Sequence, residues 1–227
     1  MEIFIDSANI DEIEKWMKMG IADGVTTNPS IMFKDGVYDM EKGAKKIATL
    51  INPRPLSVEV TSNDLNEMLA QAKQFHSWAP NNIVVKIPQI NQDGIPCYGV
   101  ISELEENGIK VNATVALSFG QVVLAAKAGA TYISIFAGRV ADEGGDAPEL
   151  IARAVGWLKR WDYKSKIIVG SIRAVIDIQG AAVAGAHVIT IPPDFLSRMA
   201  DHKYTRETVK QFASDAQKAL QMMEKGN

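Results

Sequence analysis

The chain has 227 residues, 47% of them hydrophobic, and a formal net charge of −3. This length supplies one large hydrophobic core, and the charge gives no indication of a nucleic-acid or membrane-surface partner. No apolar run approaches the roughly 20 residues of a membrane span. The one cysteine, Cys97, excludes an intrachain disulfide and a thiolate metal cluster, and the three histidines lack metal-ligand spacing. We therefore expect no metal or other cofactor. Residues 1–6 lack the pattern of a signal peptide, so we expect a cytoplasmic location.

Eight short, β-prone runs of apolar residues follow one another along the chain. They span residues 3–5, 24–26, 56–60, 83–87, 111–117, 131–136, 166–170 and 187–191. Amphipathic stretches with helical spacing lie between them, for example over residues 11–19 and 64–78. The segment 118–121, Ser-Phe-Gly-Gln, has the form of a capping box and predicts a helix over 121–128 that ends at Gly129.

This alternation predicts an α/β fold, a single-domain (β/α)8 TIM barrel over residues 1–204. An open doubly wound sheet is the alternative, but residues 6–9 lack the glycine-rich phosphate loop typical of that fold. Residues 205–223 predict one more amphipathic helix, so 205–227 form a C-terminal extension. Its apolar stripe packs either on its own barrel or on a neighbouring subunit.

Lys86 stands inside the apolar run Asn-Ile-Val-Val-Lys-Ile-Pro of residues 82–88, which predicts a buried parallel strand. Burial disfavours the charged form of a lysine and frees the lone pair of its amine. A neutral lysine in an apolar pocket is what Schiff-base chemistry on a sugar carbonyl requires. The alternative is a structural lysine, salt-bridged or reaching to water from the strand end.

Polar residues also stand where the other predicted strands end, which is where barrel enzymes place their catalytic groups. They are Asp6, Thr26, Thr27, Asn28, Glu59, Thr61, Asn112, Thr114, Ser134, Arg139, Ser171 and Arg173. Their convergence on one barrel mouth is hard to explain by packing, because an unpaired buried polar group costs about 1–3 kcal/mol.

The roles of these groups separate by their chemistry. A lysine amine that attacks a ketone forms a carbinolamine, which must lose water with the help of a proton donor and acceptor. Glu59 and Thr114, on the strands that flank Lys86, can supply that relay. Cleavage between C3 and C4 of a sugar requires removal of the C4 hydroxyl proton, and Asp6 is the remaining carboxylate for this step.

The other strand-end residues suit binding rather than proton transfer. Asn28 and Ser134 can hold the hydroxyls of a three-carbon fragment. Arg139 and Arg173 offer planar donors for a doubly charged oxyanion, and Ser171 lies on the same loop as Arg173. Barrels commonly bind phosphate near their last two strands.

Several motifs, spread over nearly the whole chain, resemble those of the small transaldolases and fructose-6-phosphate aldolases of the transaldolase family. They are Phe-Ile-Asp-Ser-Ala-Asn at 4–9, Gly-Val-Thr-Thr-Asn-Pro-Ser at 24–30, Val-Lys-Ile-Pro at 85–88, residues 121–130, Gly-Arg at 138–139, Ser-Ile-Arg at 171–173, Gly-Ala-His at 185–187 and Thr-Ile-Pro at 190–192. The second and third of these together are highly specific to the family.

The resemblance implies a role for each site residue. Lys86 would be the Schiff-base lysine, Asp6 the acid/base of carbon–carbon cleavage, and Glu59 a partner that works through water with Thr114. Substrate binding would fall to Thr26, Asn28, Ser134, Phe136, Arg139, Ser171 and Arg173.

The resemblance also bears on the activity, because free aldolases of the family tend to carry Gln and Tyr where this chain has Glu59 and Phe136. This pairing implies a transaldolase acting on sugar phosphates. Residues 89–98 and 134–139 depart from the usual motifs, which leaves open an aldolase for fructose 6-phosphate or a transferase for an atypical anionic ketose such as a sulfonated fructose. A catalytically silent sugar-phosphate-binding barrel is a further alternative. The resemblance further implies a homo-oligomer, pentameric or decameric, in which the C-terminal helix reaches a neighbour.

Overall fold

The structure is a computed structural model that describes residues 1–225. The chain divides into two compact units, Met1–Pro193 and Asp194–Asn227. The first unit contains all eight strands, and the second contains the last helix. No helix in the described part of the chain is long and apolar enough to cross a membrane.

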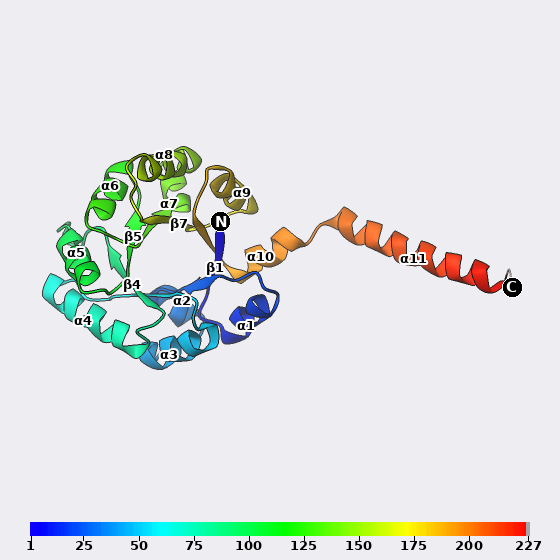
Figure 1. Cartoon of the computed structure of the whole chain (residues 1–227), viewed down its shortest axis with the longest axis horizontal. Helices are drawn as coiled ribbons and strands as arrows, with labels where there is room; N and C mark the ends of the chain where they lie inside the picture. Colours follow the sequence, from blue (N-terminus) through cyan, green and yellow to red (C-terminus); the bar gives the residue numbers. More distant parts are fainter. Residues whose placement is uncertain (226–227) are drawn as a thin grey trace. The chain divides into compact units, whose positions relative to one another are not determined.

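The first unit is a closed barrel of eight parallel strands in chain order, in which β1 pairs with both β2 and β8. The strands are β1 Glu2–Asp6, β2 Gly24–Thr26, β3 Leu56–Glu59, β4 Ile83–Pro88, β5 Val111–Ala116, β6 Tyr132–Phe136, β7 Lys166–Gly170 and β8 Val188–Ile191. Helices surround the strands on all sides (Figure 1). The predicted (β/α)8 barrel is therefore confirmed, and each strand begins and ends within about a residue of its predicted run.

Eleven helices lie within the described residues. They are α1 Ile10–Lys18, α2 Pro29–Lys34, α3 Met40–Ile51, α4 Leu65–Trp78, α5 Tyr98–Glu106, α6 Phe119–Lys127, α7 Ala137–Asp142, α8 Ala147–Arg160, α9 Val175–Val183, α10 Pro193–Ala200 and α11 Lys203–Lys225. Ser118 caps α6 as predicted, but the Gln121 side chain accepts from the backbone N–H of Leu117 rather than from that of Ser118, so the capping box is incomplete. Gly129 follows the end of α6 with φ of 87°, as a C-terminal glycine does.

One end of the barrel interior is filled by side chains from several strands. Phe4, Val84, Tyr132, Ile168 and Val188 form a buried cluster, and the rings of Phe4 and Tyr132 meet edge to face at 6.1 Å. Three of these residues lie early in their strands, so the cluster packs the amino-terminal side of the barrel. The carboxyl ends of the strands are left to form the mouth.

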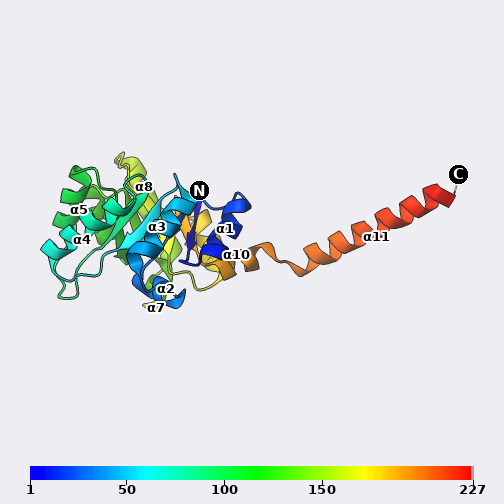
Figure 2. The ribbon, with the colours of Figure 1, turned by 90° about the horizontal axis from the view of Figure 1, so that it is seen from below.

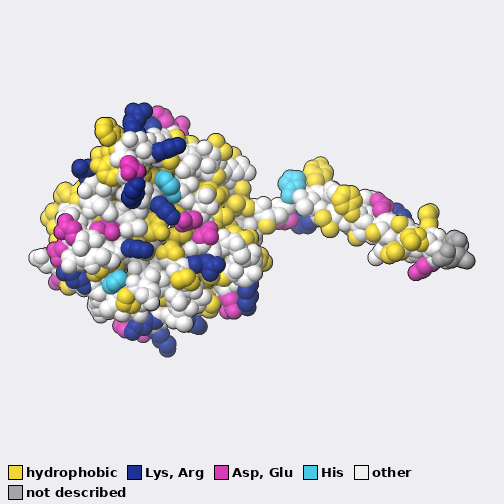
Figure 3. Space-filling view, in the orientation of Figure 1, with side chains coloured by type: hydrophobic (Ala, Val, Ile, Leu, Met, Phe, Trp, Pro, Cys, Tyr) yellow, Lys and Arg dark blue, Asp and Glu magenta, His cyan; other side chains and the backbone are white. Residues whose placement is uncertain are grey.

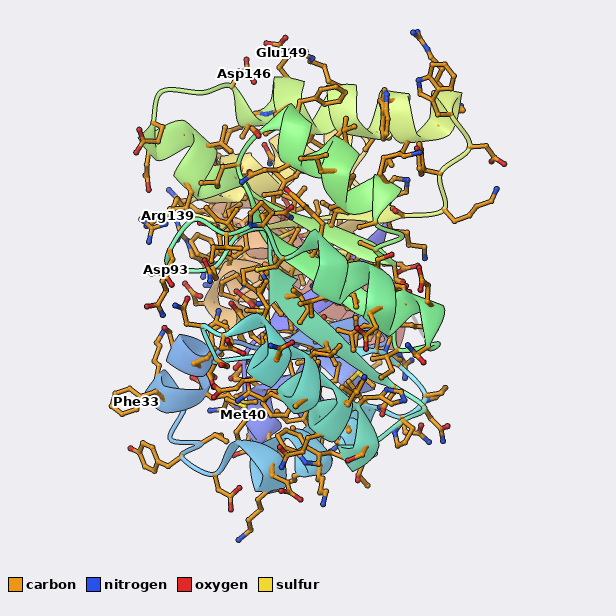
Figure 4. All side chains as sticks on the ribbon, turned by 90° about the vertical axis from the view of Figure 1, so that its left-hand side faces the viewer. Phe33, Met40, Asp93, Arg139, Asp146 and Glu149 are labelled. Carbon is orange, nitrogen blue, oxygen red and sulfur yellow. The ribbon has the colours of Figure 1, made fainter. Side chains whose placement is uncertain are left out.

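Two short helices, α2 and α7, follow directly after β2 and β6 and were not predicted from the sequence. Figure 2 shows both at the end of the barrel opposite the N-terminus. Each has six residues, which is too short for an amphipathic period to show. They carry residues to the rim of the mouth: Figure 4 shows Phe33 of α2 and Arg139 of α7 at the same end, with Asp93 of the loop after β4.

The second unit is helical. The predicted helix over 205–223 is present as α11, and residues 193–200, for which no helix was predicted, form α10. None of the described residues of α11 is buried. Its large apolar side chains include Val209, Phe212 and Leu220, and Figure 3 shows hydrophobic side chains along its length.

Candidate active site

Lys86 lies on β4 with its side chain directed into the barrel, where the residue is 4% exposed. Its Nζ is 2.8 Å from Glu59 Oε2 and donates a hydrogen bond to the carbonyl oxygen of Thr27 at 3.0 Å. Glu59 and Lys86 are register partners on adjacent strands, so the backbone pairing sets this contact. The surroundings of the amine therefore differ from the expected apolar pocket, because a buried ammonium group requires a partner charge and hydrogen bonds.

Asp6 ends β1 at the same side of the barrel, and Thr26 Oγ1 donates to its Oδ1 at 2.7 Å. Burial raises the pKa of the Asp6 carboxyl, and the nearby carboxylates Asp35 and Glu59 raise it further. The hydrogen bond from Thr26 and the charge of Lys86 act in the opposite direction. A carboxyl with a raised pKa, close to a lysine, is suited to exchange protons with a substrate.

Asn28 follows β2 and caps α2, because its Oδ1 accepts from the backbone N–H of Ile31 at 2.8 Å. This bond fixes the amide so that its NH2 group remains a donor. Ser134 on β6 donates to Asn112 Oδ1 at 2.7 Å, and Asn112 in turn donates to Ser57 at 3.3 Å. A buried polar chain therefore crosses the barrel from β6 to β3. Asn112 was among the predicted strand-end polar residues but had no assigned role, and Ser57 was not predicted.

The two predicted phosphate-binding arginines share a carboxylate. Arg173 Nη2 lies 3.0 Å from Asp142 Oδ2, and Arg139 Nη1 lies 3.9 Å from the same oxygen. The backbone N–H of Gly138 donates to the carbonyl oxygen of Ser171 at 3.0 Å, and a Cβ at Gly138 would overlap that oxygen and the side chain of Arg173. Glycine at 138 thus permits the close approach of the two loops.

A cavity of about 310 Å³ at the mouth joins most of these groups. Seven of the eleven predicted site residues line it: Asp6, Asn28, Lys86, Phe136, Arg139, Ser171 and Arg173. Three residues of α2 that were not predicted, Ser30, Ile31 and Lys34, line it as well. Cavities of this size hold small organic ligands. Its lining brings together the amine of Lys86, the carboxyl group of Asp6 and the guanidinium groups of two arginines.

The remaining predicted residues lie behind the cavity wall. Glu59 forms an ion pair with Lys86, which lines the cavity, and Thr26 donates a hydrogen bond to Asp6, which also lines it. Ser134 belongs to the buried polar chain with Asn112. Thr114 Oγ1 is buried and has no hydrogen-bond partner among the described residues. It lies where β5 shifts register between Ala113 and Ala116, and such bulges are frequent next to active sites.

Comparisons with known proteins identify the family of the chain. Residues 3–226 match the family described as transaldolase/fructose-6-phosphate aldolase. A probable transaldolase of Lactiplantibacillus plantarum is 40% identical over 225 residues, which cover 99% of this chain and 100% of that protein. One of Dehalococcoides mccartyi is 38% identical over 215 residues, which cover 95% and 97%.

Solved structures show the fold at greater distance. Two structures of a mandelate oxidase variant with FMN adducts align with TM-scores of 0.56 and 0.58 at 13% and 12% identity. They cover 81% and 96% of this chain, and 59% and 74% of the oxidase chains. At this identity the likeness extends to the barrel alone. The match over residues 3–226 and the identities of 38–40% over nearly the whole chain show that the chain belongs to the transaldolase/fructose-6-phosphate aldolase family.

Proposed function

We propose that the protein is a transaldolase that moves a dihydroxyacetone unit from a ketose phosphate to an aldose phosphate through an imine on Lys86. The donors would be sedoheptulose 7-phosphate or fructose 6-phosphate, and the acceptors glyceraldehyde 3-phosphate or erythrose 4-phosphate. The observation that carries the proposal is the buried Lys86 amine, which is paired with Glu59 and lines the same cavity as two arginines.

The first half of the reaction uses the Lys86–Glu59 pair. Glu59 takes a proton from the ammonium group, and the freed amine attacks the C2 carbonyl of the ketose. The carbinolamine then loses water, with Glu59 returning the proton to the leaving hydroxyl. Thr114 supports this role, because its buried hydroxyl lacks a partner within the described protein and a water in transit would satisfy it.

Carbon–carbon cleavage then uses Asp6. The carboxylate removes the C4 hydroxyl proton, the C3–C4 electrons pass to the iminium, and the aldehyde product leaves. The enamine of dihydroxyacetone remains on Lys86. Its hydroxyl groups would be held by hydrogen bonds with Asn28 and Ser134. An incoming aldehyde accepts the three-carbon unit by the reverse of these steps.

The anionic end of the sugar would lie against Arg139, Arg173 and Ser171, because guanidinium forks bind phosphate oxygens in pairs. Asp142 offsets part of this positive charge. That observation favours a second candidate substrate, a sulfonated ketose, because a sulfonate carries a single negative charge and a phosphate nearly two. Both substrates would use the same reaction on Lys86.

Phe136 supports transfer over free aldol cleavage. Its ring lines the cavity and offers no hydroxyl to protonate and release the enamine, so the three-carbon unit stays bound until an aldehyde arrives. An aldolase for fructose 6-phosphate is the alternative, and Phe136→Tyr is the variant that would increase free dihydroxyacetone release.

Borohydride reduction with a panel of ketoses, followed by mass spectrometry, tests the proposal. We expect a substrate-dependent mass increase at Lys86, loss of activity on reduction, and no labelling in Lys86→Met. The phosphorylated and sulfonated ketoses in the panel rank the two substrate classes. Labelling at Lys34, the second lysine of the cavity, with Lys86 unmodified would contradict the proposal.

We further propose that the protein assembles as a pentamer or decamer through α11. The side chains of Val209, Phe212 and Leu220 are 60–68% exposed within one chain, and a stripe of this kind is normally covered. Light scattering of the full chain should give an oligomer, and a chain cut before Thr205 should lose subunit contacts. A monomer mass for the full chain at micromolar concentration would contradict this assembly.

A further inference from the structure

A second hydroxyl lies behind the one that Thr26 directs at the Asp6 carboxyl. Thr190 on β8 is 6% exposed, and its Oγ1 is in hydrogen-bond contact with Oγ1 of Thr26, the residue that donates to Asp6. The strands explain the arrangement, because β1 lies between β2 and β8 in the closed barrel. Thr26 and Thr190 therefore meet across the interior from the two strands that flank Asp6.

The number of hydroxyl hydrogens determines the direction of the hydrogen bonds that connect Thr190, Thr26 and Asp6. A threonine hydroxyl carries one hydrogen, and that of Thr26 points to Asp6 Oδ1. The contact between the two hydroxyls is then a bond only if Thr190 donates to Thr26. The order of donation is Thr190 to Thr26 to Asp6, which ends on a carboxylate able only to accept.

We propose that Thr190 is a positioning residue for Asp6: it occupies the acceptor side of the Thr26 hydroxyl and so holds the hydrogen of that hydroxyl on the carboxylate. This inference rests on the proposed transaldolase reaction, in which Asp6 removes the C4 hydroxyl proton. With Oδ1 occupied by Thr26, Oδ2 is the oxygen left for the substrate, and it has no hydrogen-bond partner in the part of the chain that the structure describes.

The charges around Asp6 show why one hydrogen bond matters there. Burial and the carboxylates of Asp35 and Glu59 favour the protonated carboxyl, which cannot act as a base. Only the Thr26 hydroxyl and the positive charge on the Lys86 nitrogen oppose them, and that charge, carried by the iminium before cleavage, is lost as the C3–C4 electrons form the enamine. The oriented hydroxyl of Thr26 is the hydrogen bond that favours ionised Asp6 among the described residues, so its direction matters for the base.

Replacement of Thr190 by valine, which has nearly the same shape and no hydroxyl, tests this role. We expect kcat for transfer to fall about five- to tenfold, the size of one lost hydrogen bond, with KM changed less than twofold. The acid limb of the kcat/KM profile should move to higher pH, because Thr26, without the bond from Thr190, donates less strongly to Asp6 and favours its ionised form less. Thr190→Ser, which keeps the hydroxyl, should restore both kcat and the profile.

Two controls separate this role from a structural one. Ser165→Ala removes another buried hydroxyl, which donates to the carbonyl oxygen of Ala130 at 2.6 Å away from the mouth. It should lower thermal stability and leave the pH profile unchanged. Borohydride trapping of dihydroxyacetone on Lys86 should be unaffected in Thr190→Val, because imine formation does not use Asp6.

The outcomes are distinct. No trapping on Lys86 in the unaltered protein contradicts the proposed function itself. Normal trapping together with an unchanged kcat and pH profile in Thr190→Val overturns the positioning role alone, and so does a serine variant as impaired as the valine variant. If the valine variant does not fold, Thr190→Ala removes the same hydroxyl, and the same shift of the acid limb is required of it.

Discussion

Asp142 is predicted to weaken the binding of anionic substrates, and its replacement by asparagine should strengthen it. Its Oδ2 lies 3.0 Å from Arg173 Nη2 and 3.9 Å from Arg139 Nη1, and an arriving phosphate must compete with it. The three side chains are 48–63% exposed, so each pair contributes about 0.2–1 kcal/mol. Asparagine keeps the shape of the side chain and removes its charge.

We therefore expect Asp142→Asn to lower KM for a ketose phosphate about two- to fivefold, which corresponds to about 0.4–1 kcal/mol, with kcat unchanged. Initial rates in a coupled assay that detects glyceraldehyde 3-phosphate measure this change. The difference in KM between Asp142→Asn and the unaltered protein should become smaller as salt is added, because salt screens exposed charges. Unphosphorylated dihydroxyacetone should show no change in KM.

Glu143→Gln is the matched control, because Glu143 is exposed and adjacent and the substitution removes an equal charge. If Glu143→Gln lowers KM as much as Asp142→Asn does, the effect comes from net charge and not from the shared carboxylate. An unchanged or higher KM in Asp142→Asn would refute the reasoning, and so would an equal change for dihydroxyacetone.

Three further predictions concern the frame of the site. Glu105 accepts from two backbone N–H groups and one hydroxyl at the start of β5 and β6, so Glu105→Ala should lower the free energy of unfolding in urea by about 2–4 kcal/mol, and Glu106→Ala should lower it far less. Burial, and then the charge of Lys166, lower the pKa of His187, which accepts from a backbone N–H. The folded state therefore resists protonation that the unfolded chain accepts below about pH 6.5, so thermal stability should fall as the pH drops through this value, and His187→Gln should flatten that dependence. Gly138→Ala should displace the Ser171 loop and raise KM for phosphorylated substrates more than for dihydroxyacetone, and equal changes would contradict this.

The sequence specified the barrel because its signal is repeated: each buried parallel strand is an apolar run, and the runs recur between helical patterns. Lys86 was identifiable because a charge inside such a run is rare. Its partner Glu59 was correctly placed on the neighbouring strand, but their direct ion pair depends on strand register, which composition does not reveal.

Other parts of the site carry no such signal. Asp142 lies within the six-residue helix α7 and not at a strand end, so a search of strand ends passes over it. Thr190 lies in an apolar run, where a β-branched side chain is typical of a strand and gives no indication of a functional role. Its contact with Thr26 depends on the barrel being closed, and closure is a property of three-dimensional pairing between distant segments.

That closure links catalysis to the completion of folding. Thr26 and Thr190 are 164 residues apart, and the second edge of β1 is unpaired until β8 has been synthesised. A nascent or truncated chain that ends before residue 188 already contains Lys86, Asp6 and both arginines. It nevertheless leaves that edge open, and the Thr26 hydroxyl lacks its contact with Thr190. The rate of carbon–carbon cleavage, followed during refolding, would then report the moment at which the first and last strands join.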